Sequence, residues 1–186
     1  EKQEILIPGT ICLQQGPIEL FACAPGGKDH ESIVVLQCKP QNLHLALIAL
    51  GLRDRSELGG GGPQAPGDPA RPVGDRVVVE IEFEKDGKTQ RHRAEDLVLN
   101  LAEKKPMERA GWIFVGSAFE DERDPETGKP TGRKLYLANR YRSLMTTYHD
   151  PTTLIDNPTR EGANDESFGR GLEVFGCDER LPGLVA

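Results

Sequence analysis

Short apolar runs separated by turn-forming residues dominate the first part of the chain. They occupy residues 4–7, 10–13, 18–23 and 32–38, and each is rich in Ile, Val, Leu or Phe. Runs of this length and composition, bounded by Pro-Gly or Pro-Gly-Gly, are typical of β-strands. We therefore predict strands at all four places. The last two are predicted to form a hairpin across residues 24–30.

One segment has the pattern of a helix. Residues 40–50 begin with a proline, which suits the first turn because its missing N–H is not needed there. The segment is apolar almost all round, which predicts a helix buried on most sides against a sheet. Gly51 fits the left-handed position that follows a helix, and Leu52 fits the hydrophobic contact beyond it.

A second hairpin is predicted from strict alternation. In residues 77–84, Val77, Val79, Ile81 and Phe83 share one face. Asp86-Gly87 then predicts a tight turn into a partner strand at 89–93. On the polar face, acidic side chains of the first strand lie opposite basic ones of the second, namely Glu80, Glu82 and Glu84 opposite Arg91 and Arg93. We interpret this as a paired, solvated face.

The second half of the chain contains shorter elements. The segments that we predict are strands at 112–119, 134–138, 141–148 and 172–175 and a single helical turn at 152–155. Strands outnumber helices, and the connections resemble hairpins. The predicted fold is therefore α+β, a mainly antiparallel sheet built from hairpins with one buried helix at about 40–50 packed on it.

The domain organisation follows from composition. Residues 59–74 contain six glycines and four prolines, which cannot bury apolar surface. Because neither flank contains a complete fold, we predict a flexible insertion within one domain that spans 1–186. A charge-rich stretch at 120–133 is predicted to be a second excursion.

Charge and hydropathy exclude two classes of partner. The chain of 186 residues carries a net charge of −7, which argues against nucleic acid because such binders need a positive field. No apolar run approaches the length of a membrane-spanning segment. The four cysteines, Cys12, Cys23, Cys38 and Cys177, lack C-x-x-C spacing. Two disulfides and buried free thiols both remain open.

The densest group of reactive side chains is Lys28-Asp-His-Glu-Ser32. If the backbone bends there, His30 and Glu31 are candidate ligands of a divalent metal, with His44 from the helix as the third. The H-E-x-x-H motif is absent. In the alternative, Glu31 caps loop amides and the histidines form hydrogen bonds within the core. A candidate ligand surface comprises Lys28, Ser32, Trp112 and Ser117.

No catalytic motif is complete. Ser117 follows a glycine but lacks the G-x-S-x-G elbow, and none of the cysteines has a base that the sequence identifies. Phosphate-binding, dinucleotide-binding and EF-hand loops are missing too. The residues therefore assign no catalytic activity and favour a protein that is not an enzyme.

Several motifs together resemble the YdjY-type domain family. They are Lys28-Asp-His-Glu-Ser32, Leu43-His44-x-Ala46-Leu47-x-x-Leu50-Gly51, Trp112-x-Phe-x-Gly-Ser117, Tyr148-x-Asp150-Pro151 with Leu154–Pro158, and Asn164-Asp-Glu166. The resemblance covers most of residues 5–178. That family is described as uncharacterised and is common in cell-envelope proteins of bacteria such as planctomycetes. The resemblance implies a protein that is secreted or periplasmic after loss of a signal segment, with an envelope protein as a candidate partner. Some members carry a ferredoxin-like label, which we do not transfer because clustered cysteines are absent.

Three functional hypotheses follow. The first is a secreted, non-catalytic binding or structural module. The second is a metal-binding protein or metal-dependent enzyme that uses His30, Glu31 and His44. The third is an accessory module for electron transfer.

Overall fold

A ten-stranded sheet forms the centre of the described part of the protein. The structure is a computed structural model that describes residues 3–13, 17–60, 68, 70–170 and 180–185. In spatial order the strands of this sheet are β4 (Asp75–Val77), β9 (Trp112–Phe114), β13 (Ile155–Asp156), β12 (Ser143–Thr146), β2 (Leu20–Cys23), β3 (Ser32–Leu36), β1 (Leu6–Ile11), β15 (Arg180–Val185), β5 (Glu80–Lys85) and β6 (Lys88–Arg93). Most neighbouring strands pair antiparallel, and only β2–β3 and β12–β13 pair parallel.

Two small sheets and short helices complete the described fold. The small sheets are β10 (Phe119–Arg123) with β11 (Pro130–Tyr136), and β7 (Val98–Asn100) between β14 (Phe168–Arg170) and β8 (Lys105–Pro106). The helices are α1 (Pro40–Ala49), α2 (Leu137–Tyr141) and the 3₁₀ turns η1 (Asp29–Glu31), η2 (Ala94–Leu97), η3 (Arg160–Ala163) and η4 (Asp165–Ser167). The predicted strand-dominated α+β class is confirmed. In the described residues, no helix has the length and apolar character needed to cross a membrane.

The helix forms as predicted, and the second hairpin forms with a shorter first strand. The strand predicted at 77–84 is divided, because β5 begins at Glu80 and Val77 belongs to β4, which pairs with β9. Gly51 adopts a φ of +87°, and the N–H of Leu52 donates to the carbonyl of Leu47 at 3.2 Å, which closes α1 as a Schellman motif. Asp86 and Gly87 both have positive φ, so β5 and β6 are joined by the expected tight turn. Helix α1 is buried on fewer sides than predicted, because 67% of the surface of Leu45 is exposed.

The predicted hairpin between 18–23 and 32–38 is wrong. Strands β2 and β3 run parallel, with Leu20 opposite Ser32 and Cys23 opposite Val35. After the glycine turn the chain travels back along β2, and η1 leads it into β3 from the same end. Residues Glu19 and Glu31, which directly precede the two strands, therefore lie side by side, and the N–H of Glu19 donates to the carbonyl of Glu31 at 3.1 Å.

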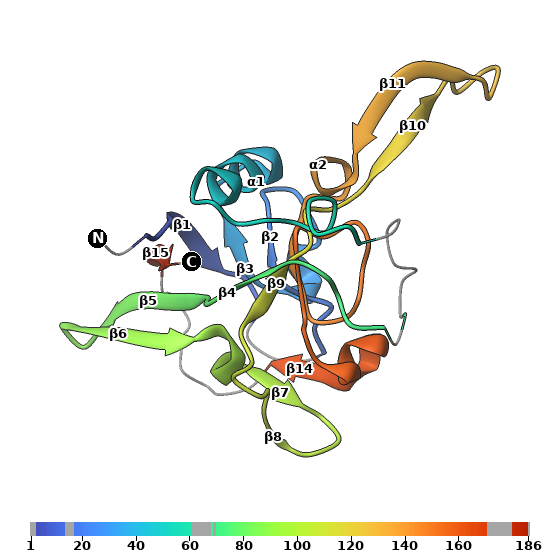
Figure 1. Ribbon diagram of the computed structural model, residues 1–186. Coiled ribbons are helices and arrows are strands. Elements are labelled where there is room, and N and C mark those ends of the chain that lie inside the picture. The colour runs from blue at the N-terminus through green and yellow to red at the C-terminus, as the bar shows by residue number, and fades with distance from the viewer. Residues whose placement is uncertain (1–2, 14–16, 61–67, 69, 171–179, 186) are drawn as a thin grey trace.

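Other predicted boundaries also change. The runs 4–7 and 10–13 belong to one strand, β1, whose register shifts at Pro8-Gly9. The charged excursion forms the β10–β11 hairpin, which extends away from the main body in Figure 1. The strand predicted at 112–119 is divided by a turn with positive φ at Gly116 and Ser117. The strand predicted at 172–175 and residues 61–67 and 69 of the predicted insertion lie outside the described residues.

The core is dominated by large apolar side chains from the main sheet. Trp112 is completely buried, and its ring centroid lies 5.9 Å from that of Phe21. Phe83 and Phe114 are equally inaccessible, and Leu43 and Leu47 of α1 join the same cluster. This core fixes the positions of β2 and β12, whose ends form the candidate site.

Candidate functional site

A pocket of about 290 Å³ lies beside the antiparallel pair β2–β12, where residues of both strands meet residues of two loops. We call it the Tyr148 pocket. Its lining residues are Glu19, Leu20, Lys28, Tyr141, Ser143, Tyr148, Asp150 and Thr152. They come from the start of β2, the loop before η1, the end of α2, the start of β12 and the loop after β12. Its volume is at the small end of ligand-binding pockets.

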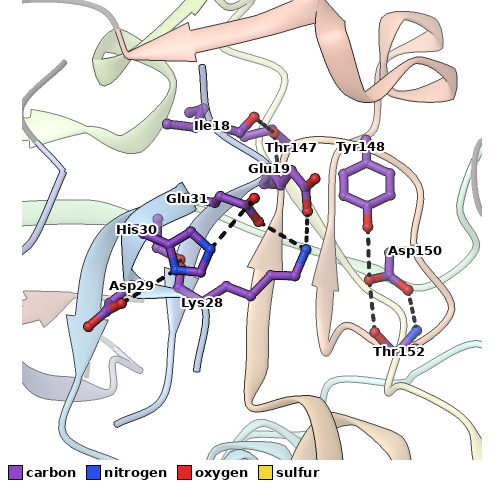
Figure 2. Close-up of polar contacts among 11 residues, drawn as sticks. Ile18, Glu19, Lys28, Asp29, His30, Glu31, Thr147, Tyr148, Asp150 and Thr152 are labelled. Carbon is purple, nitrogen blue, oxygen red and sulfur yellow. Dashed lines mark hydrogen bonds and ion pairs between the residues drawn. The ribbon is translucent and has the colours of Figure 1, made fainter. Parts of the chain in front are cut away.

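Lys28 is held between two carboxylates at one side of this pocket (Figure 2). Its ammonium pairs with Glu19 and lies 2.9 Å from Oε2 of Glu31. Partial burial lowers the pKa of Lys28, but hydrogen bonds to the two glutamates outweigh it and raise the pKa above its ordinary value. The hydrogen bond from Lys28 in turn lowers the pKa of Glu31. Both shifts favour the charged forms at neutral pH.

The opposite side of the pocket is built around Asp150 (Figure 2). Its Oδ1 accepts the backbone N–H of Thr152 at 2.8 Å, and its Oδ2 accepts the Thr152 hydroxyl at 2.8 Å and the Tyr148 hydroxyl at 3.5 Å. Burial raises the pKa of Tyr148, and the nearby negative charges of Asp150 and Glu19 raise it further. These contacts form a side-chain turn where a helical turn was predicted, and Ile155 already belongs to β13.

Ser143 is a lining residue whose hydroxyl is buried. The residue is 3% exposed, and within the described residues its Oγ has no hydrogen-bond partner. A buried polar atom without a partner carries the full cost of its lost hydration, about 1–3 kcal/mol. Most buried polar groups in native proteins are satisfied, so such an exception calls for an explanation.

The three residues predicted as metal ligands do not come together. The side chain of His30 is 72% exposed and lies 3.7 Å from carboxylate oxygens of Asp29 and Glu31. His44 instead faces Tyr136, with Nδ1 2.7 Å from the phenol oxygen, and Asp54, with Nε2 3.4 Å from Oδ2. In the part of the chain that the structure describes, no group of three or more His, Cys, Asp or Glu side chains is arranged to hold a metal ion.

Of the four residues predicted as a ligand surface, only Lys28 lies at the pocket. Ser32 is buried, and its hydroxyl donates to the carbonyl of Lys28 at 2.6 Å. Trp112 belongs to the core. Ser117 is buried too, because its hydroxyl links two backbone segments: it donates to the carbonyl of Thr152 at 2.8 Å and accepts the N–H of Ala138 at 3.0 Å. Ser32 and Ser117 therefore support the backbone of two lining residues, Lys28 and Thr152.

A polar array beside α1 was not anticipated from the sequence. It consists of Asp54, His44 and Tyr136, whose hydroxyl also donates to the carbonyl of Gly116 at 3.1 Å. Burial lowers the pKa of His44, against the opposing influence of Asp54. The array connects α1, β11 and the turn before β10. It holds the turn at Gly116 and Ser117, and the Ser117 hydroxyl contacts Thr152 of the pocket lining.

Three cysteines are buried or half-buried as free thiols in the described residues, while Cys177 lies outside them. Burial raises the pKa of Cys12 and that of Cys38, each to about 11. Desolvation also raises the pKa of Cys23. All three thiols therefore stay protonated at neutral pH and are weak nucleophiles.

Comparison with known protein families gives a match to the first part of the chain. Residues 1–136 match the family model of the YdjY domain. No curated protein and no solved structure matches the chain. The matched region includes Glu19, Lys28 and Glu31 and ends before Ser143, Tyr148 and Asp150. Because the match covers well over half of the sequence, this chain belongs to the YdjY domain family.

Proposed function

We propose that this protein is a non-catalytic binding module of the bacterial cell envelope and that the Tyr148 pocket is its ligand site. The observation that carries the proposal is the buried, unpartnered hydroxyl of Ser143 in the lining of that pocket. A ligand that forms a hydrogen bond with this hydroxyl would recover the free energy lost by burying it. Preformed pockets with a few converging polar groups are typical ligand sites.

The state of the ionisable groups favours binding over catalysis. Lys28 is committed to an ion pair, and both oxygens of Asp150 support the turn at Thr152. Tyr148 has a raised pKa, so its phenol remains protonated. General acid–base catalysis requires a group whose pKa is near the working pH and whose proton is free to move. The pocket's groups are instead arranged to accept hydrogen bonds and to hold charge.

The compartment is proposed from the family resemblance. Secreted or periplasmic location and an envelope protein partner are expectations for a YdjY-type protein. Fractionation of cells that express the full gene with an epitope tag tests this part. Recovery of the tag in the cytosolic fraction alone would contradict it.

Replacing Ser143 by alanine is expected to stabilise the protein. The change removes a buried hydroxyl that has no partner, so we expect the free energy of unfolding to rise by about 1 kcal/mol. Urea unfolding followed by the fluorescence of the single tryptophan, Trp112, measures the change. Ser32→Ala is the matched control, because it deletes an equally buried hydroxyl that does donate a hydrogen bond. It is expected to lower the stability by about 1 kcal/mol.

Opposite signs for the two serines are the essential outcome. If Ser143→Ala destabilises as much as Ser32→Ala, the Ser143 hydroxyl already has a partner, and the observation that carries the proposal is lost. Binding is tested by following backbone amide resonances while small amines, alcohols and carboxylates are added. Saturable shifts at Ser143, Tyr148 and Asp150, without chemical change of the additive, are expected.

A further inference from the structure

We infer that the Tyr148 pocket takes an organic cation with N–H donors, such as a primary alkylammonium group. This inference rests on the proposed function and specifies its ligand. The pocket lining contains the carboxylates of Glu19 and Asp150 and one ammonium, that of Lys28. Glu31, which contacts Lys28 from outside the lining, adds a third carboxylate. The charges at this place therefore sum to an excess of negative charge.

The chain itself provides an example of ammonium binding at this place. The Nζ atom of Lys28 contacts Glu19 and lies 2.9 Å from Glu31, with half of the Lys28 side chain exposed. Glu19 and Glu31 approach each other because β2 and β3 run parallel and start at the same end. Two carboxylates held side by side by the backbone are a preformed acceptor for an ammonium group.

Unused acceptors remain on the other side of the pocket. A carboxylate offers about four lone-pair positions, and Asp150 uses three of them, two with Thr152 and one with Tyr148. The Ser143 hydroxyl is unpartnered in the described residues. One ammonium group has three N–H donors, which is more than these two acceptors need. A ligand hydroxyl has a single donor and no charge.

The tyrosines of the pocket suit the apolar and cationic parts of such a ligand. Tyr141 and Tyr148 present aromatic rings, and cations are attracted to ring faces. The guanidinium of Arg140 lies 5.7 Å from the ring centroid of Tyr141, a cation–π contact within the chain itself. An anionic ligand would meet the excess carboxylates, because the charge of Lys28 is already balanced by Glu19 and Glu31.

Three probes that share a cyclohexyl ring distinguish the ligand classes. Cyclohexylamine, cyclohexanol and cyclohexanecarboxylate are titrated into the protein at pH 7 and low salt, and binding is followed by the amide resonances of Ser143 and Tyr148. We expect the amine to bind at least about tenfold more tightly than the alcohol, and the carboxylate most weakly. Added salt is expected to reduce this preference.

The variant Lys28→Met separates this inference from its rivals. It removes the internal ammonium and releases Glu19 and Glu31, so the amine is expected to bind about three- to tenfold more tightly than in the parent. Lys105→Met is the matched control: it deletes a lysine that is also paired with a glutamate, Glu103, at 2.8 Å but that does not line the Tyr148 pocket. It is expected to leave the affinity unchanged.

The outcomes assign failure to one proposal or the other. Tightest binding of the alcohol or the carboxylate, or weaker amine binding in Lys28→Met, would overturn the cation assignment and leave the pocket a binding site. If none of the three probes gives saturable shifts at Ser143 and Tyr148, in the parent or in Lys28→Met, the proposed function itself is lost.

Discussion

Gly116→Ala is expected to lower the free energy of unfolding by about 3 kcal/mol, the sum of a left-handed backbone penalty and a steric one. Gly116 has a φ of +80°, which costs an L-residue about 1–2 kcal/mol. An added Cβ would also lie 2.6 Å from the Cβ of Asp54, which is buried and cannot move away freely. For a chain of this size, the melting temperature should fall by roughly 10 °C.

The matched control for this prediction is Gly51→Ala. Gly51 has a similar φ of +87°, but a Cβ there meets no other atom within 4 Å. It therefore isolates the backbone penalty, and we expect a loss of only about 1 kcal/mol. Urea unfolding followed by Trp112 fluorescence measures both variants. Equal losses would mean that contact with Asp54 is not what requires glycine at position 116.

The same substitution reports on the route from α1 to the pocket. Displacement of Asp54 disturbs its contact with His44, and a shift of the 116–117 turn moves the Ser117 hydroxyl that supports Thr152. Amide shifts in Gly116→Ala should therefore extend to Thr152. If they stop at Asp54, the polar array stabilises the fold without positioning the pocket.

The parts of the fold that the sequence could predict are those that depend on adjacent residues. Alternation in the part of 77–84 that begins at Glu80, together with the Asp86-Gly87 pair, determines a hairpin, because strand faces and turn conformation depend on neighbouring residues. The end of α1 at Gly51 is equally local, because a positive φ there favours glycine. Both features follow from the chemistry of a few adjacent residues.

Strand pairing depends on distant segments, and this is where the prediction failed. The turn at Pro25-Gly26-Gly27 is present, but the partner that it indicated for β2 was wrong in direction. Parallel strands usually need a connection of a dozen or more residues, whereas residues 24–31 suffice here. The antiparallel neighbour of β2 is β12, more than a hundred residues later. No local pattern specifies that choice.

The same limit explains what was missed in the site. Lys28 was identified from its reactive neighbours, but Glu19, Ser143 and Asp150 join it only through the pairing of β2 with β3 and β12. Asp150-Pro151 suggested a helix start. The Thr152 that follows Asp150 by two residues is also the pattern of a side-chain turn, and that pattern could have indicated the observed geometry.

Burial of polar residues was the other source of error. Ser32 was assigned to a ligand surface through its place in the Lys28–Ser32 loop, and Ser117 was placed near that loop. Each is buried with its hydroxyl donating to a backbone carbonyl, that of Lys28 for Ser32 and that of Thr152 for Ser117. The sequence does not distinguish a buried serine hydroxyl that has hydrogen-bond partners, as at Ser117, from one without a partner in the described residues, as at Ser143.

Asp156→Asn is expected to remove a pH-dependent loss of stability. Asp156 is 2% exposed in β13, and its Oδ1 accepts the N–H of Asn157 at 2.7 Å. Burial raises the pKa of Asp156 well above its ordinary value, despite that hydrogen bond. Burial also lowers the pKa of Arg55, so the attraction between the two groups does not compensate for their desolvation.

The sign follows from proton binding. Between the unfolded pKa of Asp156 and its raised folded pKa, the folded state binds more protons than the unfolded state, so stability decreases as pH rises through this window. One proton accounts for at most about 1.4 kcal/mol per pH unit. Asparagine keeps the acceptor at Oδ1 and cannot ionise. The variant should therefore match the parent near pH 4 and exceed its free energy of unfolding at pH 7, by a margin that grows as pH rises through the window.

Denaturant unfolding of both proteins at half-unit steps from pH 4 to pH 8 measures this difference, and a ¹³C titration of the carboxyl resonances assigns it. Because other ionisable groups are common to both proteins, their contributions largely cancel in the difference. A difference that is constant with pH would mean that the Asp156 carboxyl titrates alike in the folded and unfolded states. A variant that becomes less stable than the parent as pH rises would mean that the charge of Asp156 stabilises the fold through Arg55, and that this attraction exceeds the cost of burial.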